Sequence, residues 1–202
     1  MKKIIALVLT FALALSLCAC NLGEIVNKEI SRGVIDENGY SSDYLGLIFT
    51  APDGWVYATQ GELSALMGEA IDLTDQNKLF TELQLVYDMM VQDVLTGSNV
   101  IIIYENLAVS GSEDITVEEY VEITKQGLTA VDMFTYTFGD ETNVTLGDTE
   151  FTRVTATCEY NGFTMEQAYY IAKLGSYMAS ISVTVTDGTS IETIEACFSA
   201  LE

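Results

Sequence analysis

The stretch "EFTRVTATCEYNGFTMEQAYYIAKL", residues 150–174, decides the fold that we expect for this chain. Asn161 and Gly162 separate two runs that are rich in β-branched and aromatic residues, and this dipeptide favours a type I′ turn because it tolerates positive φ at both positions. In the first run, apolar residues from Val154 to Cys158 alternate with polar ones, which places them on one face of a strand. We therefore expect a hairpin of two antiparallel strands here.

Further strands extend this hairpin into a meander. The run "TNVTLG" at 142–147 precedes it, and "SYMASISVTVTD" at 176–187 follows it with the same alternation. The run "NVIIIYENL" at 99–107 is continuously apolar and is bounded by turn residues. Such a run predicts a central strand that is buried on both faces.

Four segments have apolar residues at helical spacing, and they are 62–71, 75–95, 114–131 and 190–201. The segment 75–95 shows the strongest pattern, with apolar residues recurring every three or four positions. Thr116 and Glu119 have the spacing of a capping box at the start of a helix, and Thr189 is the expected cap of the last helix. The sequence thus predicts an α+β fold, an antiparallel sheet packed by helices.

The amino end has the pattern of an export signal. Lys2 and Lys3 precede an apolar region that is fourteen residues long, 4–17, which suits a signal-peptide core and is too short to span a bilayer. The following "LCAC" ends at Cys20 and resembles the bacterial lipobox, in which a peptidase cuts before the cysteine and the cysteine receives acyl chains such as palmitate.

The lipobox resemblance implies three regions and a location. Residues 1–19 would be a removed lipoprotein signal peptide, 20–37 a tether and 38–202 a single α+β domain. Lipidated Cys20 would hold that domain at the extracytoplasmic face of the cell membrane, because buried acyl chains bind a bilayer. The alternative is a plain secretory signal with incidental cysteines.

The chain is strongly acidic. Loss of residues 1–19 would leave 6 basic residues against 30 acidic ones, a formal charge of −24. Such a chain repels phosphate, which argues against nucleic-acid binding and leaves membrane contact to the lipid. The charge gives either a solvated surface or one that attracts cations and basic partners.

Most catalytic apparatus is missing from the sequence. There is no histidine, which excludes Ser-His-Asp and Cys-His catalysis and the usual zinc sites. No nucleotide or zinc-protease motif occurs, and we expect no cofactor. The acidic stretches at 36–39, 72–77 and 139–143 lack the full spacing of a calcium loop, and we expect no metal. A pair of catalytic carboxylates stays open.

Four further residues are candidates for local roles. Cys158 and Cys197 would either form a disulfide, if the last helix packs on the strand that carries Cys158, or remain two separate apolar thiols. Trp55 follows a turn and would be either a core anchor or, with Tyr57, part of a ligand surface.

The stretch "NGYSSDYLGLIFTAPDGW", residues 38–55, resembles the opening of PsbP-like domains, in which an extended segment leads into a turn like that of Pro52, Gly54 and Trp55. The order of the expected elements over 38–202 is also similar. The resemblance implies a PsbP-like α/β sandwich. The chain is also similar to small lipoproteins of Gram-positive gut bacteria, a likeness that carries no activity.

A surface-tethered binding or interaction module, with a protein or small-molecule ligand that the sequence does not identify, is the expected function. The motivation is the lipobox, a well-formed domain and the absence of catalytic motifs. The alternative is a hydrolase that uses carboxylates on envelope or extracellular glycans.

Overall fold

The computed structural model describes residues 29–67, 75–186 and 188–201. Contacts divide the chain into two units, Met1–Ile30 and Ser31–Glu202, and the following description concerns the second. The expected signal peptide and residues 20–28 of the expected tether, Cys20 included, lie outside the described residues. The second unit begins at Ser31, earlier than the boundary expected at 38.

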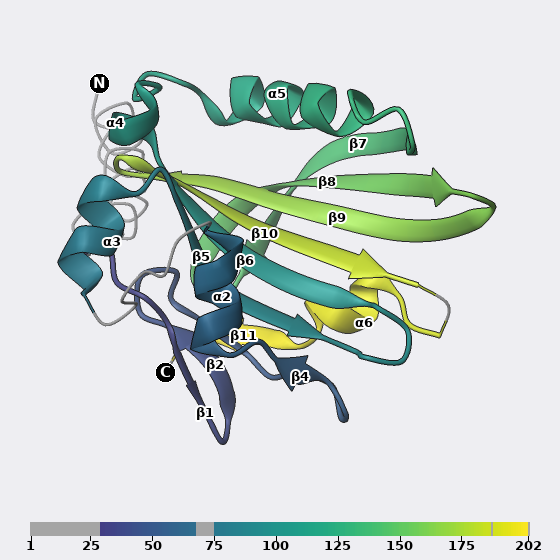
Figure 1. Ribbon diagram of the computed structural model, residues 1–202, viewed down its shortest axis with the longest axis horizontal. Helices are drawn as coiled ribbons and strands as arrows, with labels where there is room; N and C mark the ends of the chain where they lie inside the picture. Colours follow the sequence, from purple (N-terminus) through teal and green to yellow (C-terminus); the bar gives the residue numbers. More distant parts are fainter. Residues whose placement is uncertain (1–28, 68–74, 187, 202) are drawn as a thin grey trace, which may run out of the picture. The chain divides into compact units, whose positions relative to one another are not determined.

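A seven-stranded sheet forms the centre of this unit, with the order β4-β5-β6-β10-β9-β8-β7 (Figure 1). Every neighbouring pair is antiparallel. The strands are β4 (Val56–Tyr57), β5 (Leu85–Gln92), β6 (Asn99–Asn106), β7 (Thr135–Leu146), β8 (Thr149–Tyr160), β9 (Phe163–Leu174) and β10 (Tyr177–Val185). The predicted meander is therefore confirmed as β7 to β10.

The hairpin that decides the fold has the predicted turn. Asn161 and Gly162 have φ of 48° and 83°, as a type I′ turn requires, and Tyr160 pairs with Phe163 across them. The apolar residues from Val154 to Cys158 are buried on one face of β8.

A second, four-stranded sheet has the order β1-β2-β3-β11. Its strands are β1 (Val34–Asp36), β2 (Gly39–Ser42), β3 (Leu47–Phe49) and β11 (Phe198–Ala200). The helix predicted over 190–201 is wrong in its second half, since α6 (Ile191–Glu195) is short and is capped by Ser190, not Thr189. Phe198 instead pairs with Phe49, and their rings lie 4.7 Å apart. This pairing satisfies backbone groups of β3 that would otherwise be open.

The long helix predicted over 75–95 is also wrong. Helix α3 (Gln76–Glu82) covers its beginning, and β5 follows. The segment 85–92 is hydrogen-bonded between β4 and β6, with a bulge between Tyr87 and Met89. The bulge brings Asp88 and Met89 both into the interior. Sheet pairing and burial outweigh a helical spacing that arose by coincidence.

The strand predicted at 99–107 is confirmed as β6, but its burial on both faces is not. Buried residues alternate with half-buried ones along the strand. One face, with Ile102 and Tyr104, belongs to the core, while Ile101 and Ile103 on the other are partly accessible.

The remaining helices are α2 (Gln60–Leu66), α4 (Leu107–Ser110) and α5 (Val117–Thr129). Thr116 and Glu119 form the predicted capping box of α5, with both reciprocal hydrogen bonds present. Helix α2 overlaps the segment predicted at 62–71, whose end lies outside the described residues, and has a second capping box made by Thr59 and Glu62.

Helices α5 and α6 lie on opposite faces of the seven-stranded sheet (Figure 1). Val121 of α5 packs against Val154 and Ile171, whereas Glu195 of α6 accepts a hydrogen bond from Tyr170 at 2.6 Å, on the opposite face of β9. The smaller sheet lies on the α6 side, where Tyr44 packs edge-on against Tyr104 of β6. The α+β class predicted from the sequence is confirmed.

Candidate functional site

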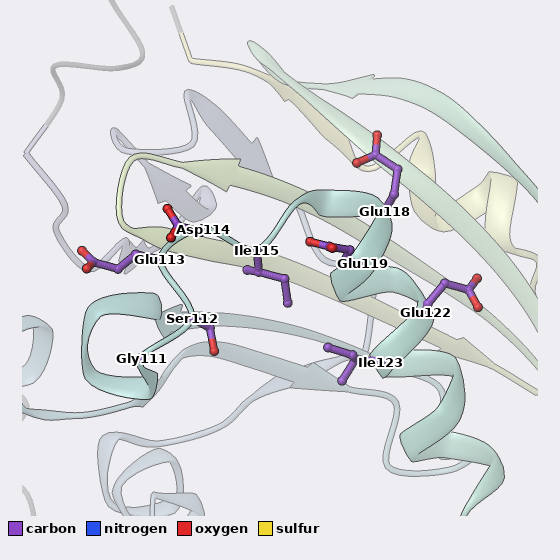
Figure 2. Close-up of a pocket in the computed structure, with 9 residues that line it drawn as sticks. All are labelled: Gly111, Ser112, Glu113, Asp114, Ile115, Glu118, Glu119, Glu122 and Ile123. Carbon is purple, nitrogen blue, oxygen red and sulfur yellow. The ribbon is translucent and has the colours of Figure 1, made fainter.

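A hollow of about 840 Å³ lies between the connection from α4 to α5 and the first half of α5 (Figure 2). Its acidic lining residues are Glu113, Asp114, Glu118, Glu119 and Glu122, and its apolar ones are Ile115 and Ile123. None of the residues that line it is basic. The hollow therefore combines an apolar surface with concentrated negative charge.

The two walls of the hollow follow from local sequence. Helix α4 ends at Gly111, whose φ of 71° is the left-handed conformation that glycine adopts most readily. The chain then turns back, with Ser112 N donating to Leu107 O at 2.8 Å. The capping box of Thr116 and Glu119 begins α5 a few residues later. The glycine that ends α4 and the capping box that begins α5 thus fix the loop between the two helices.

Lys173 of β9 holds this loop against the sheet. Its Nζ donates to the backbone oxygens of Glu113 and Ile115, at 2.6 and 2.9 Å. The ammonium group is thereby engaged with main-chain oxygens. It positions the loop but forms no ion pair with the carboxylates that line the hollow.

The five carboxylates differ in whether they form hydrogen bonds or ion pairs. Glu119 accepts from Thr116 N at 3.0 Å, and Glu122 pairs with Lys125 Nζ at 2.9 Å. The hydrogen bonds that the Lys125 ammonium donates to Glu141 and Glu122 raise the pKa of Lys125. Within the described ranges, no hydrogen bond or ion pair is formed by the side chains of the other three, which are Glu113, Asp114 and Glu118. The negative charge of the hollow is therefore largely uncompensated.

The apolar residues lie between the carboxylates. In Figure 2, Ile115 and Ile123 project into the hollow, with Glu113 and Asp114 on one side and Glu118 and Glu122 on the other. Ile123 is 56% exposed, whereas Ile115 is half-buried and packs in part against the core. An apolar strip flanked by acids on both sides is a surface that a ligand with apolar and cationic groups would match.

Among the residues that the structure describes, no group of three or more acidic, histidine or cysteine side chains converges as metal ligands would. Of the stretches weighed for calcium, 36–39 and 139–143 lie within the described ranges, and 72–74 lie outside them.

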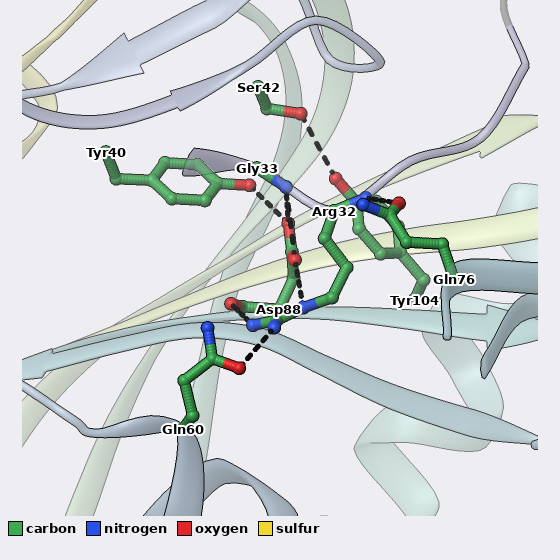
Figure 3. Close-up of polar contacts among 8 residues, drawn as sticks. All are labelled: Arg32, Gly33, Tyr40, Ser42, Gln60, Gln76, Asp88 and Tyr104. Carbon is green, nitrogen blue, oxygen red and sulfur yellow. Dashed lines mark hydrogen bonds and ion pairs between the residues drawn. The ribbon is translucent and has the colours of Figure 1, made fainter. Parts of the chain in front are cut away.

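A second polar cluster surrounds the buried Asp88 (Figure 3). Its carboxylate accepts from Arg32 Nε at 3.1 Å, Gly33 N at 2.9 Å and Tyr40 OH at 2.6 Å. Nearby, the hydroxyls of Ser42 and Tyr104 lie 3.4 Å apart. The cluster joins the beginning of the domain to β5.

The electrostatics of the Asp88 cluster indicate a structural role. We call this cluster the clasp, because it joins the beginning of the domain to β5. Burial raises the pKa of Asp88, and the donors Tyr40, Gly33 and Arg32 oppose that effect. Burial also raises the pKa of Tyr40 and Tyr104, so both hydroxyls stay protonated. Because each polar group is already paired within the cluster, it offers no free group to a ligand.

The structure does not bring Trp55 and Tyr57 together in one hollow. Tyr57 lines a separate hollow of about 310 Å³ with residues of α2 and β5, and Trp55 is not among its lining residues. Tyr57 OH donates to Phe49 O at 3.2 Å, and burial raises the pKa of Tyr57. Trp55 is half-buried, less than a core anchor would be.

Cys158 and Cys197 are free thiols in the structure. Cys158 is fully buried on β8, while Cys197 follows α6 and its Sγ lies 3.4 Å from Thr193 O. Of the two arrangements expected, the structure has separate thiols.

Sequence reasoning missed both the hollow and the clasp. The signal for the hollow was present in "GSEDITVEE", residues 111–119, where acids crowd around a helix cap. Asp88 could not be found, because it was assigned to an amphipathic helix.

No protein-family model and no curated protein matches the chain. Among solved structures, it is similar to CyanoP, the PsbP of the cyanobacterium Synechocystis, with 9% identity and a TM-score of 0.48 over 86% of this chain and 95% of that one. A Bacteroides thetaiotaomicron protein matches with 13% identity and a TM-score of 0.40 over 85% of this chain and 49% of its own.

A third similar structure is LpqN, involved in cell envelope biogenesis of Mycobacterium tuberculosis, with 12% identity and a TM-score of 0.40 over 75% of this chain and 76% of that one. These are similarities of fold, and no ligand or activity is carried over from them. No helix within the described ranges is both long and apolar enough to cross a bilayer.

Proposed function

We propose that this protein is a lipid-anchored, extracytoplasmic binding module, and that its ligand occupies the hollow between the α4–α5 connection and α5. The single observation that carries the binding role is the lining of that hollow. It exposes Ile123 and part of Ile115 among five carboxylates. Three of these carboxylates form no hydrogen bond or ion pair among the described residues, so the lining offers both apolar surface and uncompensated charge.

The anchor is supported by the sequence. The basic Lys2 and Lys3, the apolar run 4–17 and the "LCAC" ending at Cys20 occur in the order that a lipoprotein signal requires. Acyl chains on Cys20 would bind a membrane at roughly 0.8 kcal/mol for each buried CH₂ group. Because the chain is acidic, the lipid rather than a basic surface would supply this contact.

A hydrolytic role has less support. Catalytic carboxylates of hydrolases face one another in an enclosed site, whereas the five carboxylates of the hollow are exposed. The buried Asp88 is already bound by Arg32, Gly33 and Tyr40. The glycan hydrolase considered from the sequence is therefore not proposed.

The anchor is tested by labelling producing cells with a palmitate analogue and fractionating them. The wild-type chain should carry label and sediment with membranes, and Cys20→Ala should do neither. Unlabelled wild-type protein, or Cys20→Ala protein that stays on the membrane, would refute the anchor.

The binding role is tested by site-directed photo-crosslinking in the same membranes. A photoreactive amino acid replaces Ile123, which is 56% exposed in the hollow, or Leu95 as a matched control, which is 91% exposed in the β5–β6 turn. We expect a discrete crosslinked product from position 123 alone. No product, or the same product from both positions, would contradict a ligand in the hollow.

A further inference from the structure

We infer that the ligand of this hollow is a cationic amphipathic peptide segment, with basic side chains on both edges of an apolar row. This inference rests on the proposed binding role and gives it a chemistry. It follows from three properties of the hollow, which are its charge, its apolar strip and the way the two are arranged.

The charge of the hollow selects a basic partner. Five of its lining residues are acidic and none is basic, and Lys173, which holds the adjoining loop, is engaged by the backbone oxygens of Glu113 and Ile115. A segment with lysine or arginine would find three carboxylates, those of Glu113, Asp114 and Glu118, that have no counter-charge among the described residues. An acidic or phosphorylated partner would be repelled.

The apolar strip excludes a simple cation. Ile115 and Ile123 lie in the middle of the hollow (Figure 2), and a polyamine or a metal ion would leave Ile123 and the accessible part of Ile115 in contact with water. A leucine-like side chain that covers them would remove apolar surface from water on both partners. The volume of about 840 Å³ also exceeds what one ammonium group fills.

The arrangement distinguishes a peptide from a small molecule. Carboxylates stand on both sides of the isoleucines, with Glu113 and Asp114 on the loop and Glu118 and Glu122 one turn apart on α5. A ligand that uses both rows needs charges on two edges separated by apolar groups. An amphipathic helix presents this pattern when it lies in a groove.

The test uses the full chain in phosphatidylcholine vesicles and a fluorescent helical peptide of leucine and lysine, about 15 residues long. Fluorescence anisotropy gives the affinity, and protein-free vesicles provide the blank. Two control peptides replace every lysine by glutamate or every leucine by serine. We expect binding of the leucine–lysine peptide only, and binding that weakens with salt.

Variants of the protein locate the binding. Glu113→Gln with Glu118→Gln should weaken binding about tenfold, and Ile123→Ser about fivefold. Glu37→Gln with Asp53→Asn removes the same charge from exposed turns of the β1–β2 and β3–β4 regions, remote from α5 (Figure 1), and should leave the affinity unchanged. Circular dichroism checks that each variant is folded.

Three results would overturn the inference. They are no binding of the leucine–lysine peptide, equal binding of its serine control, and equal weakening by the remote charge variant. If crosslinking at position 123 still succeeds, the binding role stands and only the peptide chemistry is wrong.

Discussion

Replacing Asp88 with alanine removes the acceptor at the centre of the clasp between the start of the domain and β5. Three donors, which are buried or half-buried, then lose their acceptor. They are Arg32 Nε, Gly33 N and Tyr40 OH. The side chain of Asp88 is 0% exposed, and the side chain of Arg32 is 8% exposed. The substitution therefore leaves a cation poorly solvated and two donors unpaired.

The expected loss of stability follows from these contacts. Removal of one partner of a buried ion pair costs about 3–5 kcal/mol. We expect the lower end, about 3 kcal/mol, because Arg32 adjoins exposed Gln60 and can turn towards water. Urea unfolding measures the loss, and the single tryptophan, Trp55, provides the fluorescence signal. As a control, Lys125→Met breaks two surface pairs, with Glu122 and Glu141, and should cost about 1 kcal/mol or less.

A double substitution tests whether the pair acts as one unit. Arg32→Met with Asp88→Ala also removes the unpaired cation, so it should cost no more than Asp88→Ala alone. The reasoning is refuted if Asp88→Ala costs less than about 1 kcal/mol, or if the two single costs add.

Three further predictions concern other parts of the domain. Hydrogen bonds from Thr59 hold the pKa of Glu62 below its usual value. The Glu62 carboxylate therefore stabilises the fold above its pKa in the unfolded chain, about 4.3, and this contribution is lost as the pH falls through its lower pKa in the folded protein. The stability difference between wild type and Glu62→Gln should shrink in acid, and a pH-independent difference would contradict this. Burial raises the pKa of the Cys197 thiol, and Cys158 is 0% exposed. Iodoacetamide followed by peptide mass spectrometry should show slow labelling of Cys197 in the native protein and labelling of Cys158 only after unfolding, whereas equal rates would refute it. Gly147 has φ of 62°, and an added Cβ would lie 2.4 Å from Leu47 Cβ, whereas Gly175 has φ of 60° with nothing within 4 Å. Gly147→Ala should therefore cost at least about 2 kcal/mol and Gly175→Ala about 1 kcal/mol in urea unfolding, and equal costs would show that the close approach is unimportant.

The meander was predictable because its signals are local. Asn161-Gly162 dictates a turn from two residues, and alternation along the flanking runs needs only the neighbouring sequence. The capping box of Thr116 and Glu119 is equally local, and it marked the start of α5 correctly. Such signals depend on backbone geometry within a few residues, so they survive in the folded domain.

The errors arose where distant partners decide the structure. Residues 85–92 have helical spacing, but hydrogen bonds from β4 and β6 make them a strand. Phe198 likewise extends the last helix in the sequence pattern, yet it pairs with Phe49, far away along the chain. No local pattern reports which strand edge is open, so tertiary pairing overrides the local preference.

The candidate site was predictable only in its chemistry. Net acidity left two readings open, a solvated surface or one that attracts cations and basic partners. The ligand surface expected at Trp55 and Tyr57 stays a prediction, and Tyr57 lines a hollow that Trp55 does not. The hollow depends on how Lys173 of β9 holds the loop after α4. That contact joins residues far apart in the chain, and only the structure displays it.

Amide hydrogen exchange of the full chain in phosphatidylcholine vesicles, with and without the leucine–lysine peptide, tests the acidic hollow most directly. The expected result is slower exchange confined to residues 111–123, with the hollow beside Tyr57 unchanged. Protection that appears beside Tyr57 instead, or no protection at a peptide concentration that saturates the anisotropy signal, would contradict the assignment of the ligand surface.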